Sequence, residues 1–130
     1  MNIGQAAKQS GLSAKMIRYY EDIGLIDAAK RTDAGYRIYT EQDVKTLNFI
    51  RHARELGFSA EQMKGLISLW KNTDRSSAEV KQLALKHIDD LNQKIKTLQE
   101  MVNTLEQSVS CCAGNESPDC SILEHIEKGH

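Results

Sequence analysis

A regular apolar repeat in the C-terminal half of the chain sets the strongest limit on its fold. The repeat advances by alternating steps of four and three residues through Ala84, Ile88, Leu91, Ile95, Leu98, Val102, Leu105 and Val109. A 3.5-residue period among charged and polar residues is typical of a coiled-coil seam. One chain supplies one such helix, so we expect a homodimer. The alternative, a helix packed on its own domain, would call for a wider apolar face.

Shorter helices are expected before this repeat, because glycines and capping residues divide the N-terminal half into periodic segments. Helices over residues 3–9 and 14–24, joined by a glycine turn, form the helix-turn-helix pattern. Capping boxes at Thr40 and Ser59 predict two more helices, ending near residues 54 and 70, that complete the core. Ser76 with Glu79 opens the long helix.

The segment AKRTDAGYRIYT, residues 29–40, alternates Arg and Tyr on either side of an Asp-Ala-Gly turn. This pattern predicts a two-stranded hairpin, or wing. The fold class is therefore mostly α. It comprises a winged helix-turn-helix domain over residues 1–74, a coiled-coil dimerisation helix over 75–109, and a cysteine-containing loop with a short helix over 110–130. We expect Asp119 to cap that short helix.

Charge is divided unevenly along the chain. Residues 1–54 carry nine Lys and Arg against six Asp and Glu, while residues 55–130 carry eight against twelve. A basic excess confined to the helix-turn-helix end indicates a nucleic-acid surface.

The second short helix has one face suited to DNA. Lys15, Arg18 and Tyr19 share it, whereas Ile17 and Tyr20 share the opposite face. Such a helix can enter the major groove, and hairpin arginines and tyrosines can contact flanking phosphates. The alternative is that the tyrosines are half-buried core and the arginines a solvated rim.

Other classes of protein are less compatible with the sequence. No apolar run reaches the length of a signal peptide or a membrane span, so we expect a cytoplasmic protein without a membrane partner. No nucleophile, base and orienting group are recognisable together, so we do not expect an enzyme. Trp70 and Phe58 could stack on a ligand, but aromatic residues at helical spacing are usually core.

Three cysteines lie close together in SCCAGNESPDC, residues 110–120. In a reducing compartment such a cluster favours metal or redox chemistry over a disulfide framework. Cys112 and Cys120 can close a loop around a thiophilic ion such as Cu(I) or Zn(II). Zinc usually takes four ligands, and the additional candidates are Cys111 and His125.

Charge distinguishes the possible ions. Two thiolates with a monovalent ion keep a net negative charge, whereas a divalent ion makes the site neutral. The start of the long helix, with Ser77 and Lys81, would favour the anion if the loop folds over it.

Three segments carry a resemblance to a known family: MNIGQAAKQSGLSAKMIRYYEDIGLI, GYRIYT and FIRHARELGFS. They resemble the MerR family of transcriptional regulators over essentially the whole chain. The resemblance implies a winged helix-turn-helix, an antiparallel coiled-coil homodimer and a C-terminal effector loop. The DNA-contacting set that it implies is Lys15, Arg18, Tyr19, Tyr20, Arg31, Tyr36 and Arg37. Family members act on promoter DNA with RNA polymerase by bending and underwinding a promoter whose two elements are too far apart.

The cysteine loop resembles the Cu(I)-responsive, CueR-like branch of this family and also gold-responsive members. Zinc, cadmium and lead branches place a cysteine at the position that matches Ser77. The resemblance implies an activator of metal efflux or detoxification genes with one Cu(I), Ag(I) or Au(I) per loop. Cys112 and Cys120 would be the ligands, Ser77 and Lys81 would surround them, and Cys111 is a possible extra ligand. Two alternatives stay open: a divalent-metal sensor and a thiol-redox sensor.

Overall fold

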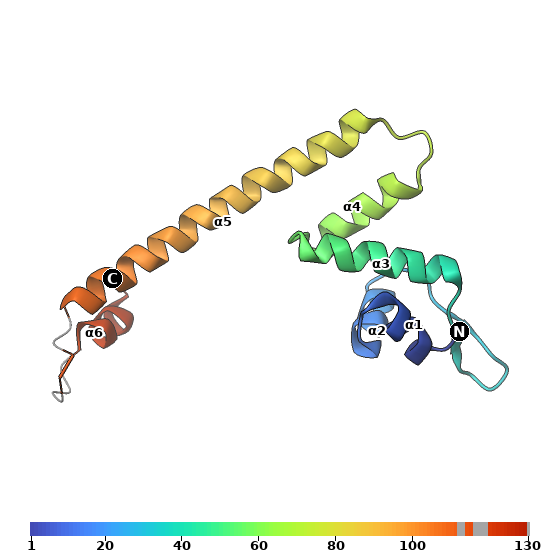
Figure 1. Ribbon diagram of the computed structural model, residues 1–130, viewed down its shortest axis with the longest axis horizontal. Helices are drawn as coiled ribbons and strands as arrows, with labels where there is room; N and C mark the ends of the chain where they lie inside the picture. Colours follow the sequence, from blue (N-terminus) through green and yellow to red (C-terminus); the bar gives the residue numbers. More distant parts are fainter. Residues whose placement is uncertain (112–113, 116–119, 130) are drawn as a thin grey trace. The chain divides into compact units, whose positions relative to one another are not determined.

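The computed structural model describes residues 1–111, 114–115 and 120–129. These residues form two compact units, Met1–Leu83 and Ala84–His130. Within the described part of the chain the structure is mostly helical, with six helices and one two-stranded sheet (Figure 1). The predicted fold class, a helix-turn-helix followed by a long helix, is confirmed.

The helix-turn-helix consists of α1 (Ile3–Ser10) and α2 (Ala14–Asp22). Asn2 caps α1 by accepting a hydrogen bond from the Gln5 amide, and Ser13 caps α2 in the same way through Met16. These side chains satisfy amides that lack a partner in the first turn of a helix. The two helix starts are therefore fixed by local sequence.

The hairpin consists of β1 (Lys30–Arg31) and β2 (Arg37–Ile38), which pair antiparallel with Arg31 opposite Arg37. Its turn closes where Gly35 donates a backbone hydrogen bond of 2.8 Å to the Thr32 carbonyl. Gly35 has a φ of +87°, which an L side chain rarely adopts. The predicted Asp-Ala-Gly turn is confirmed.

Two further helices, α3 (Glu41–Glu55) and α4 (Ala60–Lys71), begin at the predicted capping boxes of Thr40 and Ser59. With α1 and α2 they enclose one apolar core. The buried core residues are Ala6, Leu12, Ile17, Tyr20, Leu25, Ile26, Tyr39, Val44, Leu47, Ile50, Ala53, Met63 and Ile67.

Trp70 packs between helices. Its ring stacks on Phe49 of α3, with the centroids 4.3 Å apart and the planes within 10° of parallel. One face of the indole is thus covered by Phe49, which supports the interpretation of Trp70 as a core residue.

Arg51 of α3 holds the turn between α1 and α2. Its Nε donates a hydrogen bond of 2.8 Å to the Ser10 carbonyl, one of the last carbonyls of α1. Gly11 follows at a φ of +74°, and a Cβ there would lie 3.0 Å from the Arg51 Nε. The turn therefore needs glycine for its backbone and for the approach of Arg51.

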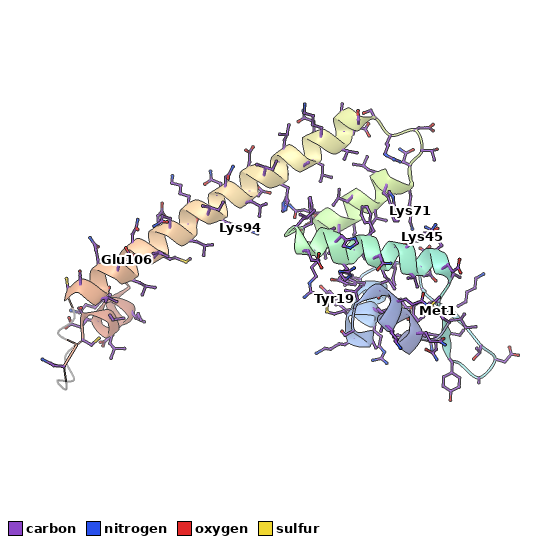
Figure 2. All side chains as sticks on the ribbon, viewed as in Figure 1. Met1, Tyr19, Lys45, Lys71, Lys94 and Glu106 are labelled. Carbon is purple, nitrogen blue, oxygen red and sulfur yellow. The ribbon has the colours of Figure 1, made fainter. Side chains whose placement is uncertain are left out.

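Tyr39 ties the hairpin to the core. Its side chain is 2% exposed, and its backbone pairs with Met1, which lies beside the hairpin (Figure 2). Its hydroxyl donates a hydrogen bond of 3.3 Å to the Glu21 carboxylate. Burial raises the pKa of Tyr39 above its ordinary value of 10.0, and the negative charge of Glu21 acts in the same direction.

The second unit contains most of α5 (Ser77–Cys111) together with α6 (Ser121–Lys128). Figure 1 shows α6 beside the C-terminal end of α5, where the Ser121 hydroxyl donates a hydrogen bond of 2.7 Å to the Ser108 carbonyl. None of the helices in the described residues has the length and apolar character needed to cross a membrane.

Replacing Gly11 with alanine should destabilise the N-terminal unit more than the same change at Gly24. Both glycines have a positive φ, +74° and +77°, but a Cβ at Gly24 meets nothing within 4 Å. The shared backbone cost is about 1–2 kcal/mol. Displacing Arg51 from Ser10 should add about 1 kcal/mol to Gly11→Ala. Urea unfolding, followed by the fluorescence of the single tryptophan, measures both free energies. Equal losses would contradict the role given to Arg51.

Tyr39→Phe should make the stability less sensitive to alkaline pH. The unfolded chain ionises Tyr39 near pH 10.0, whereas the folded chain keeps the hydroxyl neutral to higher pH. The stability that this neutral group contributes is therefore present below pH 10 and is lost as pH rises towards the raised pKa. Unfolding free energies at several pH values should fall less steeply for Tyr39→Phe than for wild type. Tyr36→Phe, at a side chain 73% exposed, is the control and should follow wild type.

Candidate nucleic-acid interface and metal-binding loop

The outer face of α2 presents three of the predicted DNA-contacting residues. Lys15 and Arg18 are exposed, and Tyr19 is 47% exposed. Tyr20 lies on the other face with only 2% of its surface exposed, and its ring centroid is 5.6 Å from that of Tyr19. The side chain of Tyr20 therefore belongs to the core, beneath the surface formed by the other three.

A hollow of about 240 Å³ brings the hairpin residues together with α2. Its lining includes Arg18 from α2 and Arg31, Tyr36 and Arg37 from the hairpin. The structure thus gathers four predicted residues that lie up to 19 positions apart in the sequence. Asn2 and Ile3, which were not predicted, also line it because the start of α1 lies beside the hairpin.

The hairpin holds its own tip in place. The Arg31 guanidinium donates a hydrogen bond of 2.9 Å to the Gly35 carbonyl, across the turn. The Tyr36 amide donates one of 3.1 Å to the Thr32 hydroxyl, which leaves the ring of Tyr36 73% exposed. The exposed ring of Tyr36 can therefore contact a ligand while its backbone stays hydrogen-bonded within the hairpin.

Glu21, at the end of α2, was missed by sequence reasoning. Its side chain is 8% exposed, and its carboxylate lies 3.3 Å from the Arg37 Nε. The other carboxylate oxygen accepts a hydrogen bond of 2.6 Å from the Ala29 amide, just before β1. Its position gives no sequence signal, because an acid at the end of an amphipathic helix usually faces solvent.

Taken together, these residues form a surface for an anion. Three guanidinium groups line one shallow hollow, and an exposed tyrosine stands at its rim. Arginine presents a planar set of donors that matches phosphate oxygens, and often does so through two hydrogen bonds at once. The hollow is therefore chemically suited to a phosphate of a nucleic-acid backbone.

The start of α5 forms a second hollow, of about 710 Å³, lined by Thr73, Arg75, Ser77, Val80 and Lys81. The structure thus brings Ser77 and Lys81 together, as predicted, and adds a second cation. Arg75 is held there by hydrogen bonds of 3.1 Å to the carbonyls of Trp70 and Asn72.

The predicted cap of α5 is also present. The Glu79 amide donates a hydrogen bond of 3.3 Å to the Ser76 hydroxyl. Cations beside a helix N-terminus make this hollow electropositive.

Cys111 and Cys120 lie at the C-terminal end of α5 and at the start of α6. Cys111 is the last residue of α5 and is exposed, whereas Cys120 is half-buried at the N-cap of α6; neither is in a disulfide. Cys112 and Asp119 lie outside the described residues. The N-cap of α6 is Cys120, not the predicted Asp119, and the Cys120 side chain makes no capping hydrogen bond.

Ser108 fastens α6 to α5. It is 1% exposed, its hydroxyl contacts the Nδ1 of His125, and its carbonyl accepts the hydrogen bond from Ser121. His125 therefore uses one ring nitrogen in packing. Ser108 was missed by sequence reasoning, although a small polar residue next to Val109 on the edge of an apolar seam is a usable signal for a neighbouring helix.

The donor chemistry fits a thiophilic ion. Among the described residues no cluster of three or more His, Cys, Asp and Glu could hold a metal, and Cys112 is outside that set. Cys120 stands where the amides of the first turn of α6 favour negative charge, including that of a thiolate. A soft ion that needs few ligands suits such a sulfur site.

Two family models match the chain. The model described as MerR HTH family regulatory protein matches residues 1–70, and the one described as MerR, DNA binding matches residues 44–108. Between them they cover α1 to α4, the hairpin and nearly all of α5.

Individual proteins are also similar. Heavy metal-dependent transcription regulator 2 of Rhizobium meliloti (strain 1021) is 54% identical over 99% of this chain and 88% of the relative. The HTH-type transcriptional regulator CueR of Escherichia coli O6:H1 is 40% identical over 97% of this chain and 93% of that one. The crystal structure of the transcription regulator PbrR691 from Ralstonia metallidurans CH34 in complex with lead(II) has a TM-score of 0.81 at 27% identity, over 97% and 98% of the two chains. With the family models, these similarities confirm the predicted family: the chain belongs to the MerR family of helix-turn-helix transcriptional regulators.

Proposed function

We propose that this chain is a metal-responsive transcriptional activator of metal efflux or detoxification genes, and that its effector is Cu(I), or the related ions Ag(I) and Au(I). The observation that carries the proposal is the position of Cys120, a half-buried thiol at the positive end of α6. Relatives described as heavy metal-dependent regulators and as CueR, at 54% and 40% identity, support it.

DNA binding is assigned to α2 and the hairpin. In this proposal Lys15, Arg18 and Tyr19 enter the major groove, where arginine can pair with guanine. Arg31, Tyr36 and Arg37 contact the phosphates beside that groove from the hollow of 240 Å³. Tyr20 supports this surface from the core instead of contacting DNA, since only 2% of it is exposed.

The metal ligands in this proposal are the thiolates of Cys112 and Cys120. With a monovalent ion they keep one negative charge, which α6 favours at its N-terminus and which cations would stabilise further. The hollow that contains Ser77 and Lys81, and also Arg75, supplies such cations. A divalent ion would leave the two-thiolate site neutral and gain little from this surrounding.

The length of α5 indicates which copy supplies that hollow. A helix of 35 residues is about 52 Å long, so its first and last residues are far apart. Ser77 opens this helix and Cys111 ends it. We therefore assign Ser77 and Lys81 at each site to the second copy in an antiparallel dimer.

Dimerisation is assigned to the apolar seam of α5. Six seam residues are between 45% and 62% exposed in the single chain: Ile88, Ile95, Leu98, Val102, Leu105 and Val109. Covering exposed apolar surface at heptad spacing with a second helix lowers the free energy of the protein. The proposed dimer would place two DNA-binding units on one promoter.

Activation in this proposal works through DNA shape. Metal binding shifts the population of dimers towards one that bends and underwinds the promoter so that RNA polymerase can use it. The energy comes from the differential affinity of the metal for that dimer. Cys120 is suited to this role because it begins α6, which is hydrogen-bonded to the dimerisation helix through Ser121 and Ser108.

A divalent-metal sensor is the second candidate. The structural relative PbrR691 is described in complex with lead(II), and Cys111 is exposed and available as a further ligand. His125 is the other candidate ligand, but its Nδ1 contacts Ser108, so only the remaining ring nitrogen could bind metal.

Titration of the reduced protein without oxygen should separate the two candidates. We expect two sulfur ligands per Cu(I) by X-ray absorption, together with activation of transcription in vitro and no activation by Zn(II). Three or more ligands with a zinc response would favour the divalent-metal sensor.

Cys112→Ser should abolish the response to Cu(I) without changing affinity for promoter DNA, because a hydroxyl is a poor ligand for a soft ion. Cys111→Ser is the matched control and should respond like wild type. In vitro transcription and DNA binding by fluorescence anisotropy measure the two properties separately. Loss of DNA binding in folded Cys112→Ser would contradict the separation of the metal site from the DNA surface.

Leu98→Asp should dissociate the dimer, because it places a charge in the apolar seam. Thr97→Asp, one residue away and outside the seam, should leave the dimer intact. Sedimentation equilibrium measures the mass of each variant. A Leu98→Asp protein with the mass of wild-type dimer would show that another surface holds the subunits together.

A further inference from the structure

A buried carboxylate lies directly behind the arginine-lined hollow. Glu21 is 8% exposed, and one of its oxygens is 3.3 Å from both the Arg37 Nε and the Tyr39 hydroxyl. Its other oxygen accepts a hydrogen bond of 2.6 Å from the Ala29 amide. One side chain at the end of α2 thus contacts the segment before β1, strand β2 and the residue that follows β2.

The contact with Glu21 also orients Arg37. The Arg37 Nε is buried, whereas about a quarter of the side chain, 24%, is exposed, and Arg37 lines the hollow with Arg18 and Arg31. The Nε lies 3.3 Å from the carboxylate, within ion-pair distance but without hydrogen-bond geometry, so the charge of Glu21 holds the guanidinium from behind. An arginine that is ordered before binding loses less rotamer freedom when it meets a phosphate.

The negative charge of Glu21 has a second effect, which is electrostatic. Arg18, Arg31 and Arg37 converge on one shallow hollow, and like charges repel. A carboxylate that is largely shielded from solvent offsets this repulsion at short range. It does so from behind Arg37, where it leaves the outer surface of the hollow to the cations.

We propose that Glu21 is a positioning residue for DNA binding, which sets the angle of the hairpin on α2 and presents Arg37 to a backbone phosphate. The inference rests on the proposed DNA-binding function and adds an acidic residue to it. Glu21 itself does not touch DNA. It acts through Arg37, and through the attachment of the hairpin to the recognition helix.

The sign of the effect distinguishes positioning from simple charge. If Glu21 acted only as a negative charge near DNA, its removal would tighten binding, since phosphate would be repelled less. If it positions Arg37, removal weakens binding even though the protein becomes more positive. The two roles therefore predict opposite changes for one isosteric substitution.

The test uses the full-length protein and a DNA duplex that wild type selects from a random-sequence pool. Glu21→Gln should bind this duplex about tenfold more weakly. This is the scale of one lost hydrogen bond between Arg37 and a charged phosphate. The slope of log affinity against log salt should become shallower by about one, because one phosphate contact is lost. Asp22→Asn, the next residue on α2 and exposed, removes the same charge and should bind as tightly as wild type or more tightly.

Arg37→Ala tests whether Glu21 affects DNA binding through Arg37. It should weaken binding about as much as Glu21→Gln, and the double variant should be no weaker than Arg37→Ala alone. Additive losses, or a Glu21→Gln protein that binds at least as tightly as wild type, would overturn the proposal. If wild type selects no duplex, or Arg37→Ala binds normally, the failure lies with the proposed DNA surface instead.

Circular dichroism first checks that Glu21→Gln is folded. If it is not, Arg37→Lys provides the test instead. Lysine keeps the positive charge but cannot reach both the carboxylate and a phosphate through one planar group. Binding about tenfold weaker than wild type, with an unchanged unfolding midpoint, is the result expected for a positioned guanidinium. Wild-type affinity for Arg37→Lys would overturn the proposal.

Discussion

The apolar stripe along α5 is largely exposed in the described part of the chain, and the proposed function depends on what covers it. Seam residues such as Leu98 are 59% exposed, and burying apolar surface yields about 25 cal/mol per Å². In the proposed antiparallel dimer, the end of one α5 meets the start of the other. The loop with Cys120 on one subunit would then lie beside Lys81 of the partner subunit. Dimerisation and metal recognition would therefore both depend on the pairing of the two α5 helices.

Most of the fold could be predicted because its signals are local. A cap such as Thr40 satisfies amides within its own first turn, so helix starts follow from a few adjacent residues. The hairpin turn follows from Gly35, whose positive φ is a property of one residue. The heptad repeat is regular enough to predict a long helix, and α5 is continuous from Ser77 to Cys111.

What could not be predicted depends on contacts between distant residues. Nothing in the sequence pairs Glu21 with Arg37, because both look like ordinary surface charges until the hairpin folds back on α2. For Tyr20 the helical period favoured the face opposite the DNA surface while the resemblance named it a DNA contact, and only the structure, in which it is 2% exposed, decides for the core. For Ser108 the sequence offers a signal for a neighbouring helix, but its contact with Ser121 of α6 appears only in the structure.

The hydrogen bond from Ser121 to Ser108 has an entropic consequence for the cysteine loop. It joins residues 13 positions apart and so fixes both ends of the segment between α5 and α6. Closing a flexible loop of that size costs about 2 kcal/mol in chain entropy. The docking of α6 on α5 meets that cost. An ion bound between Cys112 and Cys120 would then not have to meet that cost again, which is how a site with few ligands can still bind tightly.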